Sequence, residues 1–152
     1  MQKRSSRGIR NNNPLNIRVG NKWKHECAST TEREFEVFDE MKWGIRAGFM
    51  VLFRYIDFYR LKTIPSIIKR WAPPSENITQ AYIDTVCGLT GFPEETKIEY
   101  TQKGTMCNIF KAMAMVESGL KIDEDLISEG YDLAIQDFVP TKRFNMLPTD
   151  NI

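Results

Sequence analysis

Glu117 is the side chain in this sequence whose surroundings best suit acid catalysis. A rotation of about 100° per residue places it on the same helical face as three apolar side chains, Met106, Phe110 and Met113. It also falls in the last turn, where the negative end of the helix dipole disfavours another negative charge. Burial and the dipole would both raise the pKa of the carboxyl group. A carboxylic acid that stays protonated near neutral pH can protonate a glycosidic oxygen. The alternative is a Glu at a frayed helix end that points into solvent.

A second carboxylate is expected if a glycosidic bond is cleaved with the help of a nucleophile or base. Three candidates lie close together near the N-terminus: Glu32, Glu34 and Glu36. Glu34 and Glu36 alternate with apolar residues, so they share one face of a predicted strand. We favour Glu34 as the second catalytic residue. The alternative is that all three form the solvent face of that strand.

An asparagine-rich stretch supplies candidate ligands for a polar substrate. It reads Gly8-Ile9-Arg10-Asn11-Asn12-Asn13-Pro14-Leu15-Asn16-Ile17-Arg18. Asparagine competes with the backbone for hydrogen bonds and proline restricts the residue before it, so this composition predicts a shaped loop. A turn-rich connector is the alternative. The candidate substrate-binding residues combine this loop with nearby or aromatic side chains: Asn12, Asn13, Asn16, Arg18, Trp23 and Tyr82.

The composition indicates an ordinary globular chain and excludes several functional classes. The 152 residues are 41% hydrophobic and 27% charged, with a net charge of +1. This balance gives no overall field that would attract nucleic acid, so the basic residues near the N-terminus predict a solvated arm. No apolar run is long enough to insert into a membrane, and no secretory signal follows the basic residues. Three widely spaced cysteines predict neither a disulfide framework nor a zinc site.

No cofactor or metal is expected. The adjacent residues His25, Glu26 and Cys27 cannot all face one ion without distortion, and the sequence has one histidine. That histidine lies in a polar loop, which gives no support to a serine hydrolase triad. There is also no glycine-rich phosphate loop.

Hydrophobic periodicity predicts a mainly α, α+β fold that could hold these residues together. Residues 1–7 are expected to form a flexible arm, 8–138 a single domain and 139–152 an irregular tail. Residues 9–38 are predicted as a small β-lobe, with a hairpin turning at Gly20-Asn21 and a strand at 34–38. Helices are predicted at 42–60, 63–72, 78–88, 105–119 and 123–138, and the first of these is apolar on most sides, as a central helix would be.

Several motifs in fixed order resemble a family of small phage and prophage proteins. They are GIRNNNPLNIR, Trp23, FEVF leading into WGIRAGFMVL, IIKRWAPPSENIT and MCNIFKAMAMVESG. The likeness covers about residues 8–135. Members are described as virion structural proteins with peptidoglycan-degrading, lysozyme-like activity. One departure is Leu15, where the family pattern NNNPGNIR has glycine. If that glycine needs a positive φ, the loop must bend differently here.

A more distant resemblance implies a lysozyme-like fold with rearranged order. Lysozyme-like and bacterial glucosaminidase domains have a helix ending in a sequence similar to Ala114-Met115-Val116-Glu117-Ser118-Gly119, followed by an asparagine-rich loop. Here the loop comes first and the helix near the end. The resemblance implies that Glu117 is the general acid and that the asparagine loop forms the opposite wall of a cleft.

Two functions follow as expectations. The first is cleavage of peptidoglycan glycan strands by a hydrolase or a lytic transglycosylase, with the linkage and the route left open. The second is a non-catalytic virion or cell-wall-binding protein that keeps the fold. The expected partners are bacterial peptidoglycan and virion components, without nucleic acid. We expect a monomer that is made in the cytoplasm and acts on the periplasmic wall or is carried in a virion.

Overall fold

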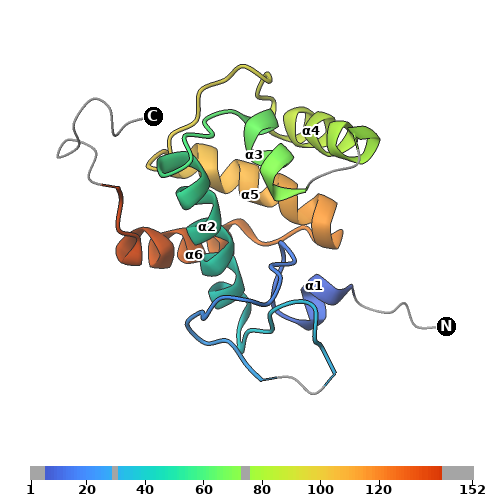
Figure 1. Ribbon diagram of the computed structural model, residues 1–152, viewed down its shortest axis with the longest axis vertical. Helices are drawn as coiled ribbons and strands as arrows, with labels where there is room; N and C mark the ends of the chain where they lie inside the picture. The colour runs from blue at the N-terminus through green and yellow to red at the C-terminus, as the bar shows by residue number, and fades with distance from the viewer. Residues whose placement is uncertain (1–5, 29–30, 73–75, 142–152) are drawn as a thin grey trace.

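The structure is a computed structural model that describes residues 6–28, 31–72 and 76–141. Most of the predicted arm and tail, residues 1–5 and 142–152, therefore lie outside the described residues. Six α-helices form within the described ranges (Figure 1): α1 (Arg7–Arg10), α2 (Met41–Asp57), α3 (Ile64–Trp71), α4 (Glu76–Thr90), α5 (Lys103–Ser118) and α6 (Glu124–Asp137). The prediction of a mainly α-helical fold is confirmed.

The core forms around α2, which lies at the centre of the molecule (Figure 1). Its apolar residues are buried on several sides, among them Ile45, Phe49, Phe53 and Ile56. α6 packs along it, and the two helices are tied by an ion pair between the buried Arg46 and Asp137 at 2.9 Å. α3, α4 and α5 complete the same hydrophobic core. The pattern that is apolar on most sides therefore predicts the central helix correctly.

The ends of two helices show how local sequence sets their bounds. α3 begins after Thr63, whose hydroxyl accepts a hydrogen bond from the Ser66 N–H in a capping box. α4 starts at Glu76, two residues earlier than predicted, and continues through Gly88. It ends at Thr90, and the following Gly91 has φ +78°.

The predicted N-terminal β-lobe does not form among the described residues. The chain between α1 and α2 runs as turns and extended pieces, with isolated bridges at Arg18–Phe35 and Glu26–Phe38. Residues 17–19 pair with 34–36 instead of folding back on Trp23. The cause is visible at Asn13, whose side-chain amide donates to the carbonyls of Ile17 and Glu36, so an amide replaces part of a strand ladder.

The asparagine loop packs tightly against two helices. A β-carbon at Gly44 of α2 would overlap the Asn12 carbonyl oxygen, so only glycine allows this approach. At the end of α5, the Ser118 hydroxyl donates to the Pro14 carbonyl at 2.7 Å. α1 begins at Arg7, so the first residues of the predicted loop form a helical turn that lies beside the end of α5 (Figure 1).

Leu15 does not have a positive φ. The left-handed residues of the loop are Asn12 and Asn16, with φ of 52° and 53°. Asparagine tolerates this region better than most residues. Leu15 is instead fully buried in the core, next to Gly48 of α2. The loop therefore bends at its asparagines and uses Leu15 as an anchor.

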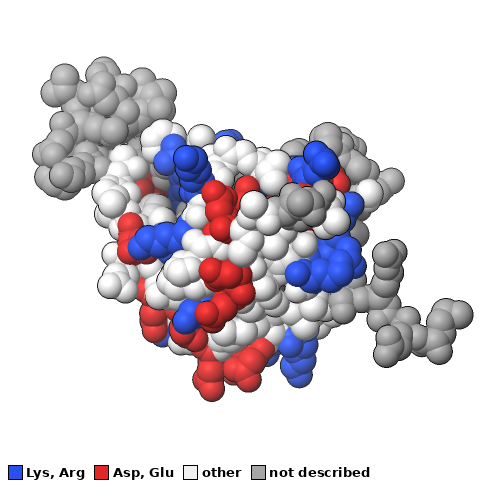
Figure 2. Space-filling model, turned by 90° about the horizontal axis from the view of Figure 1, so that it is seen from below, with Lys and Arg blue, Asp and Glu red and all other residues white. Residues whose placement is uncertain are grey.

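The surface carries both charge signs. On the face shown in Figure 2, Lys and Arg side chains are interspersed with Asp and Glu. One ion pair on the surface joins Lys24 of the N-terminal segment to Asp137 of α6, with a nitrogen–oxygen distance of 2.9 Å. No helix in the described part of the chain has the length and apolarity needed to cross a bilayer.

Candidate functional site

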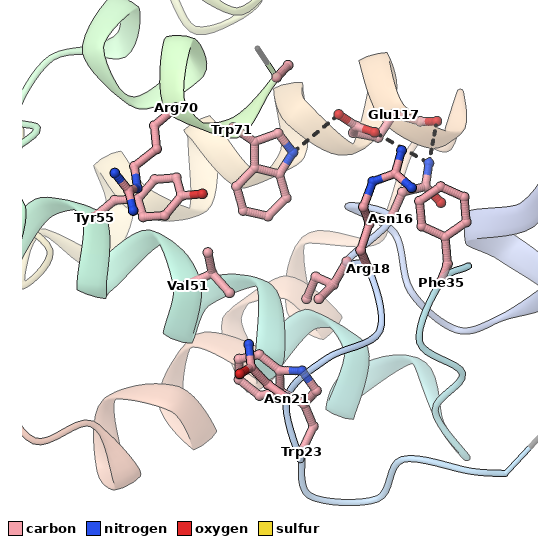
Figure 3. A pocket seen from close by; sticks show the side chains of 12 residues that line it. Asn16, Arg18, Asn21, Trp23, Phe35, Val51, Tyr55, Arg70, Trp71 and Glu117 are labelled. Atoms are coloured by element: carbon pink, nitrogen blue, oxygen red, sulfur yellow. Dashed lines mark hydrogen bonds between the residues drawn. The ribbon is translucent and has the colours of Figure 1, made fainter. Parts of the chain in front are cut away.

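A cavity of about 650 Å³ lies between the N-terminal segment and the helices α2, α3 and α5 (Figure 3). The N-terminal segment contributes Asn16, Ile17, Arg18, Asn21, Trp23 and Phe35. The helices and the residue after α3 contribute Val51, Tyr55, Arg70, Trp71, Ala72 and Glu117. Aromatic and aliphatic surfaces thus surround a few polar groups, which is the usual construction of a ligand site.

Glu117 is held in this lining by donors from two other segments. The Trp71 indole N–H donates to Oε2 at 3.3 Å. The Asn16 side-chain amide contacts Oε1 at 3.4 Å and donates to the Glu117 backbone carbonyl at 3.1 Å. Figure 3 shows the three side chains converging. The structure therefore brings together Asn16 and Glu117, which are 101 residues apart.

Burial raises the pKa of Glu117 above its ordinary value. The side chains of Tyr82, Asn16 and Trp71 act in the opposite direction, as does the positive charge of Arg18. Tyr82 is almost completely buried, and its hydroxyl is near enough to lower the Glu117 pKa without the geometry of a full hydrogen bond. Burial thus favours the protonated form of the carboxyl group, while the polar side chains around it stabilise the ionised form.

The other candidate substrate-binding residues divide into two sets. Arg18 and Trp23 line the cavity with Asn16. Asn12 and Asn13 do not line it, because their amides bind backbone. The Asn12 amide donates to the Phe38 carbonyl at 2.9 Å. The Asn13 side chain is fully buried; its amide N–H groups donate to backbone carbonyls, and its Oδ1 accepts from the Ile17 N–H. Tyr82 lies beside Glu117 without lining the cavity.

Glu34 lies outside the cavity lining. Its carboxylate bridges two guanidinium groups, with Arg7 at 2.8 Å and Arg18 at 2.9 Å. Hydrogen bonds from Arg18 and Arg7 lower its pKa, so it stays ionised. Glu32 and Glu36 are also absent from the lining, which leaves Glu117 as the one acidic residue among the described residues that line the cavity.

The lining also contains residues that were not predicted as site residues, and the most prominent of these are Tyr55, Arg70 and Trp71. Periodicity indicates core positions for the aromatic pair, and both are in fact half-buried. Trp71 packs edge-on against Tyr55, with ring centroids 6.0 Å apart. A signal was present in the sequence, because Trp71 is followed directly by an alanine and two prolines that stop a helix, so Trp71 is expected at a helix end.

Neither the cavity nor its surroundings offer a metal centre. Among the described residues, no three or more His, Cys, Asp and Glu side chains are grouped so as to hold an ion. His25 stacks on Trp43, with centroids 3.9 Å apart, and contacts Asp39 at 3.0 Å. The functional groups that the described lining residues offer are therefore one carboxyl group, two guanidinium groups, amides, indoles and the phenol of Tyr55.

Comparison with known proteins relates the chain to a bacteriophage. No family model matches the sequence. The chain is 38% identical over 133 residues to Protein P5 of Pseudoalteromonas phage PM2, and the match covers 84% of this chain and 81% of that protein. Identity at this level, over most of both sequences, identifies the chain as a member of the phage PM2 protein P5 family.

Proposed function

We propose that the protein cleaves the glycan strands of bacterial peptidoglycan, with Glu117 as the general acid. The observation that carries this proposal is the position of Glu117 in the cavity lining, where burial raises its pKa and Asn16 and Trp71 orient its two oxygens. A protonated, oriented carboxyl group is what departure of a sugar oxygen requires. Relationship to a phage protein is in keeping with a substrate in the wall of a bacterial host.

The reaction begins with proton transfer from Glu117 to the bridging oxygen as the bond between that oxygen and the anomeric carbon breaks. The positive charge then develops on the sugar ring. Because no second carboxylate is found among the lining residues that the structure describes, we favour closure by the sugar's own C6 hydroxyl, whose proton returns to the Glu117 carboxylate. The products are a 1,6-anhydro sugar and a free hydroxyl, as in lytic transglycosylases, and Glu117 is protonated again.

The other lining residues have separate roles in this proposal. Asn16 and Trp71 orient the acid, while the rings of Trp71, Tyr55 and Trp23 offer apolar faces to sugar rings. Asn16 Oδ1 is buried and has no hydrogen-bond partner among the described residues, so in this proposal Asn16 acts through the amide N–H groups that hold Glu117. Glu34 takes no part in bond cleavage and instead holds Arg18 at the cavity wall.

The test is the E117Q variant on purified peptidoglycan, with mass spectrometry of the released fragments. We expect the unmodified chain to release anhydro-ended fragments and E117Q to lose at least about 100-fold in rate, the lower end for a general acid. The matched control is E95Q, an exposed glutamate outside the lining. Full activity of E117Q would refute the assignment, and reducing ends in place of anhydro ends would refute ring closure.

A non-catalytic wall-binding role is the competing proposal, and it is favoured by the finding that the described part of the lining contains a single acidic residue. It predicts that the unmodified chain and E117Q bind sacculi equally and that neither releases fragments. The same experiment separates the two proposals, because binding is measured by sedimentation with sacculi and cleavage by the appearance of new chain ends.

A further inference from the structure

We propose that Arg70 binds a carboxylate on the peptide-bearing arm of the muramic sugar, so that the cavity selects peptide-substituted glycan over uncharged glycan. This inference rests on the proposed function, whose substrate it narrows. It concerns the side of the cavity away from the acid: in Figure 3, Arg70 and Tyr55 lie on one side of Trp71, and Glu117 lies on the other.

Aromatic rings hold the Arg70 guanidinium in place. Its central carbon lies 3.7 Å from the centroid of the Tyr59 ring and 5.2 Å from that of Tyr55. Arg70 also interacts with the Tyr55 hydroxyl. A guanidinium has five N–H groups, so the remaining N–H groups of its edge stay available to a ligand. Because the stacking limits the rotamers of this long side chain, less conformational entropy is lost when a ligand binds.

The charge of Arg70 is not neutralised within the protein. It has no ion-pair partner in the parts of the chain that the structure describes, and it is exposed at the cavity. The other lining arginine differs, because Arg18 contacts Glu34 at 2.9 Å and lies over the Phe35 ring. Arg70 is therefore the cation in the lining that is best placed to accept an anion from a ligand.

The geometry of a guanidinium edge indicates the kind of anion. Two parallel N–H groups match a planar carboxylate, and such bidentate pairs are stronger than neutral hydrogen bonds. The sugar rings of glycan strands carry no charge, whereas the peptides amide-linked to the lactyl group carry free carboxylates, the first of them on the glutamate that follows the alanine. A phosphate from another wall polymer would offer similar oxygens, so the experiment must separate these two sources.

The experiment measures binding by calorimetry with the full chain carrying E117Q, so that the ligand is not consumed. One ligand is the disaccharide N-acetylglucosaminyl-N-acetylmuramyl-L-alanyl-D-glutamate. Its matched partner is the same compound with both carboxylates converted to carboxamides. We expect the carboxylate form to bind about tenfold more tightly, as for one charge-assisted hydrogen-bonded pair at a partly exposed site, and we expect salt to reduce the difference.

Two further variants assign the preference to Arg70. Adding R70Q should make the two ligands bind equally, while R70K should keep a smaller preference because it retains charge without the planar edge. R54Q is the control, because Arg54 also lies over an aromatic ring, Phe58 at 4.8 Å, but does not line the cavity. R54Q should keep the full preference.

The inference fails if the E117Q chain binds both ligands equally, if the preference survives R70Q, or if R54Q abolishes it as completely as R70Q does. If an equal concentration of inorganic phosphate displaces the disaccharide dipeptide, Arg70 is a phosphate-binding residue, and the proposal that it binds a carboxylate is overturned. Failure of the unmodified chain to cleave walls counts against the proposed function, and this binding preference is measured independently of cleavage.

Discussion

At the scale of single residues, the candidate site depends on opposing influences on one carboxyl group. Burial raises the pKa of Glu117, while Tyr82, Asn16 and Trp71 lower it. A general acid needs both influences, because it must hold a proton before the reaction and be stable without one afterwards. The side chains around Glu117 therefore decide the pH range over which it can act.

Tyr82 offers a way to measure this balance without touching the cavity lining. Because its hydroxyl lowers the Glu117 pKa, Y82F should raise that pKa. The high-pH limb of the cleavage profile, where the acid loses its proton, should move to higher pH. The measurement is the pH dependence of kcat/KM on soluble glycan fragments. A loss of activity at every pH with no movement of the limb would indicate a purely structural role for Tyr82.

The asparagines of the loop illustrate how similar residues acquire different roles. Asn13 is fully buried and makes three hydrogen bonds to backbone groups. Asn12 also binds backbone, whereas Asn16 reaches Glu117. Residue type predicts a hydrogen-bonding loop in each case. Only the direction of each side chain decides which asparagine supports the fold and which contacts the acid.

At the scale of elements, the site depends on how closely the asparagine loop approaches two helices. The loop reaches the end of α5 through Ser118 and Asn16, and it packs on α2 at Gly44. Glu117 lies at the C-terminal end of α5, where Gly119 has φ +63° and terminates the helix. Displacement of the loop would remove the amide that contacts the carboxyl group.

Replacement of Gly44 by alanine should test this close approach. A β-carbon there overlaps the Asn12 carbonyl, so G44A should lower the free energy of unfolding by about 1–3 kcal/mol, as overpacking does, and weaken cleavage. The control is G88A in α4, where a β-carbon meets no neighbouring atom. G88A should stabilise the protein by about 0.5–1 kcal/mol. Urea unfolding of both variants is the measurement, and equal effects would show that the loop does not restrict α2.

At the scale of the whole molecule, stability should respond to pH through a pair of carboxyl groups in the segment between α1 and α2. Glu36 is 6% exposed, and burial together with the neighbouring Glu26 raises its pKa to about 7. The Gly20 N–H acts in the opposite direction. The unfolded chain has no such environment, so Glu36 there should titrate near 4.5.

This difference gives the sign of the effect. The pKa of Glu36 is higher in the folded state, so the folded state binds the proton more tightly than the unfolded state does. Protonation of Glu36 therefore stabilises the fold at low pH, and this stabilisation is lost as the pH rises from about 4.5 through about 7. The loss should be on the order of 3 kcal/mol. E36Q should remove most of this dependence, as measured by chemical unfolding across that window. A variant with the same pH slope as the unmodified chain would contradict the prediction.

Local patterns determine the helices of this protein before any contact between distant residues is known. The apolar faces of α2 and α5, the cap at Thr63 and the glycine after α5 all depend on neighbours within a few residues. The same reasoning places Glu117 on the apolar face of a helix. The helical architecture and the leading acid candidate could therefore be predicted from periodicity.

Tertiary structure alone decided what surrounds that acid. Extended segments pair through distant partners, so the register of 17–19 with 34–36, and the absence of a hairpin at Trp23, could not be read from local sequence. For the same reason, local sequence could not predict the ion pairs that hold Glu34 outside the cavity, or the position of Arg70 at the edge of the cavity. Sequence spacing specifies which side chains share a helix face, whereas the arrangement of separate segments depends on packing summed over the whole core.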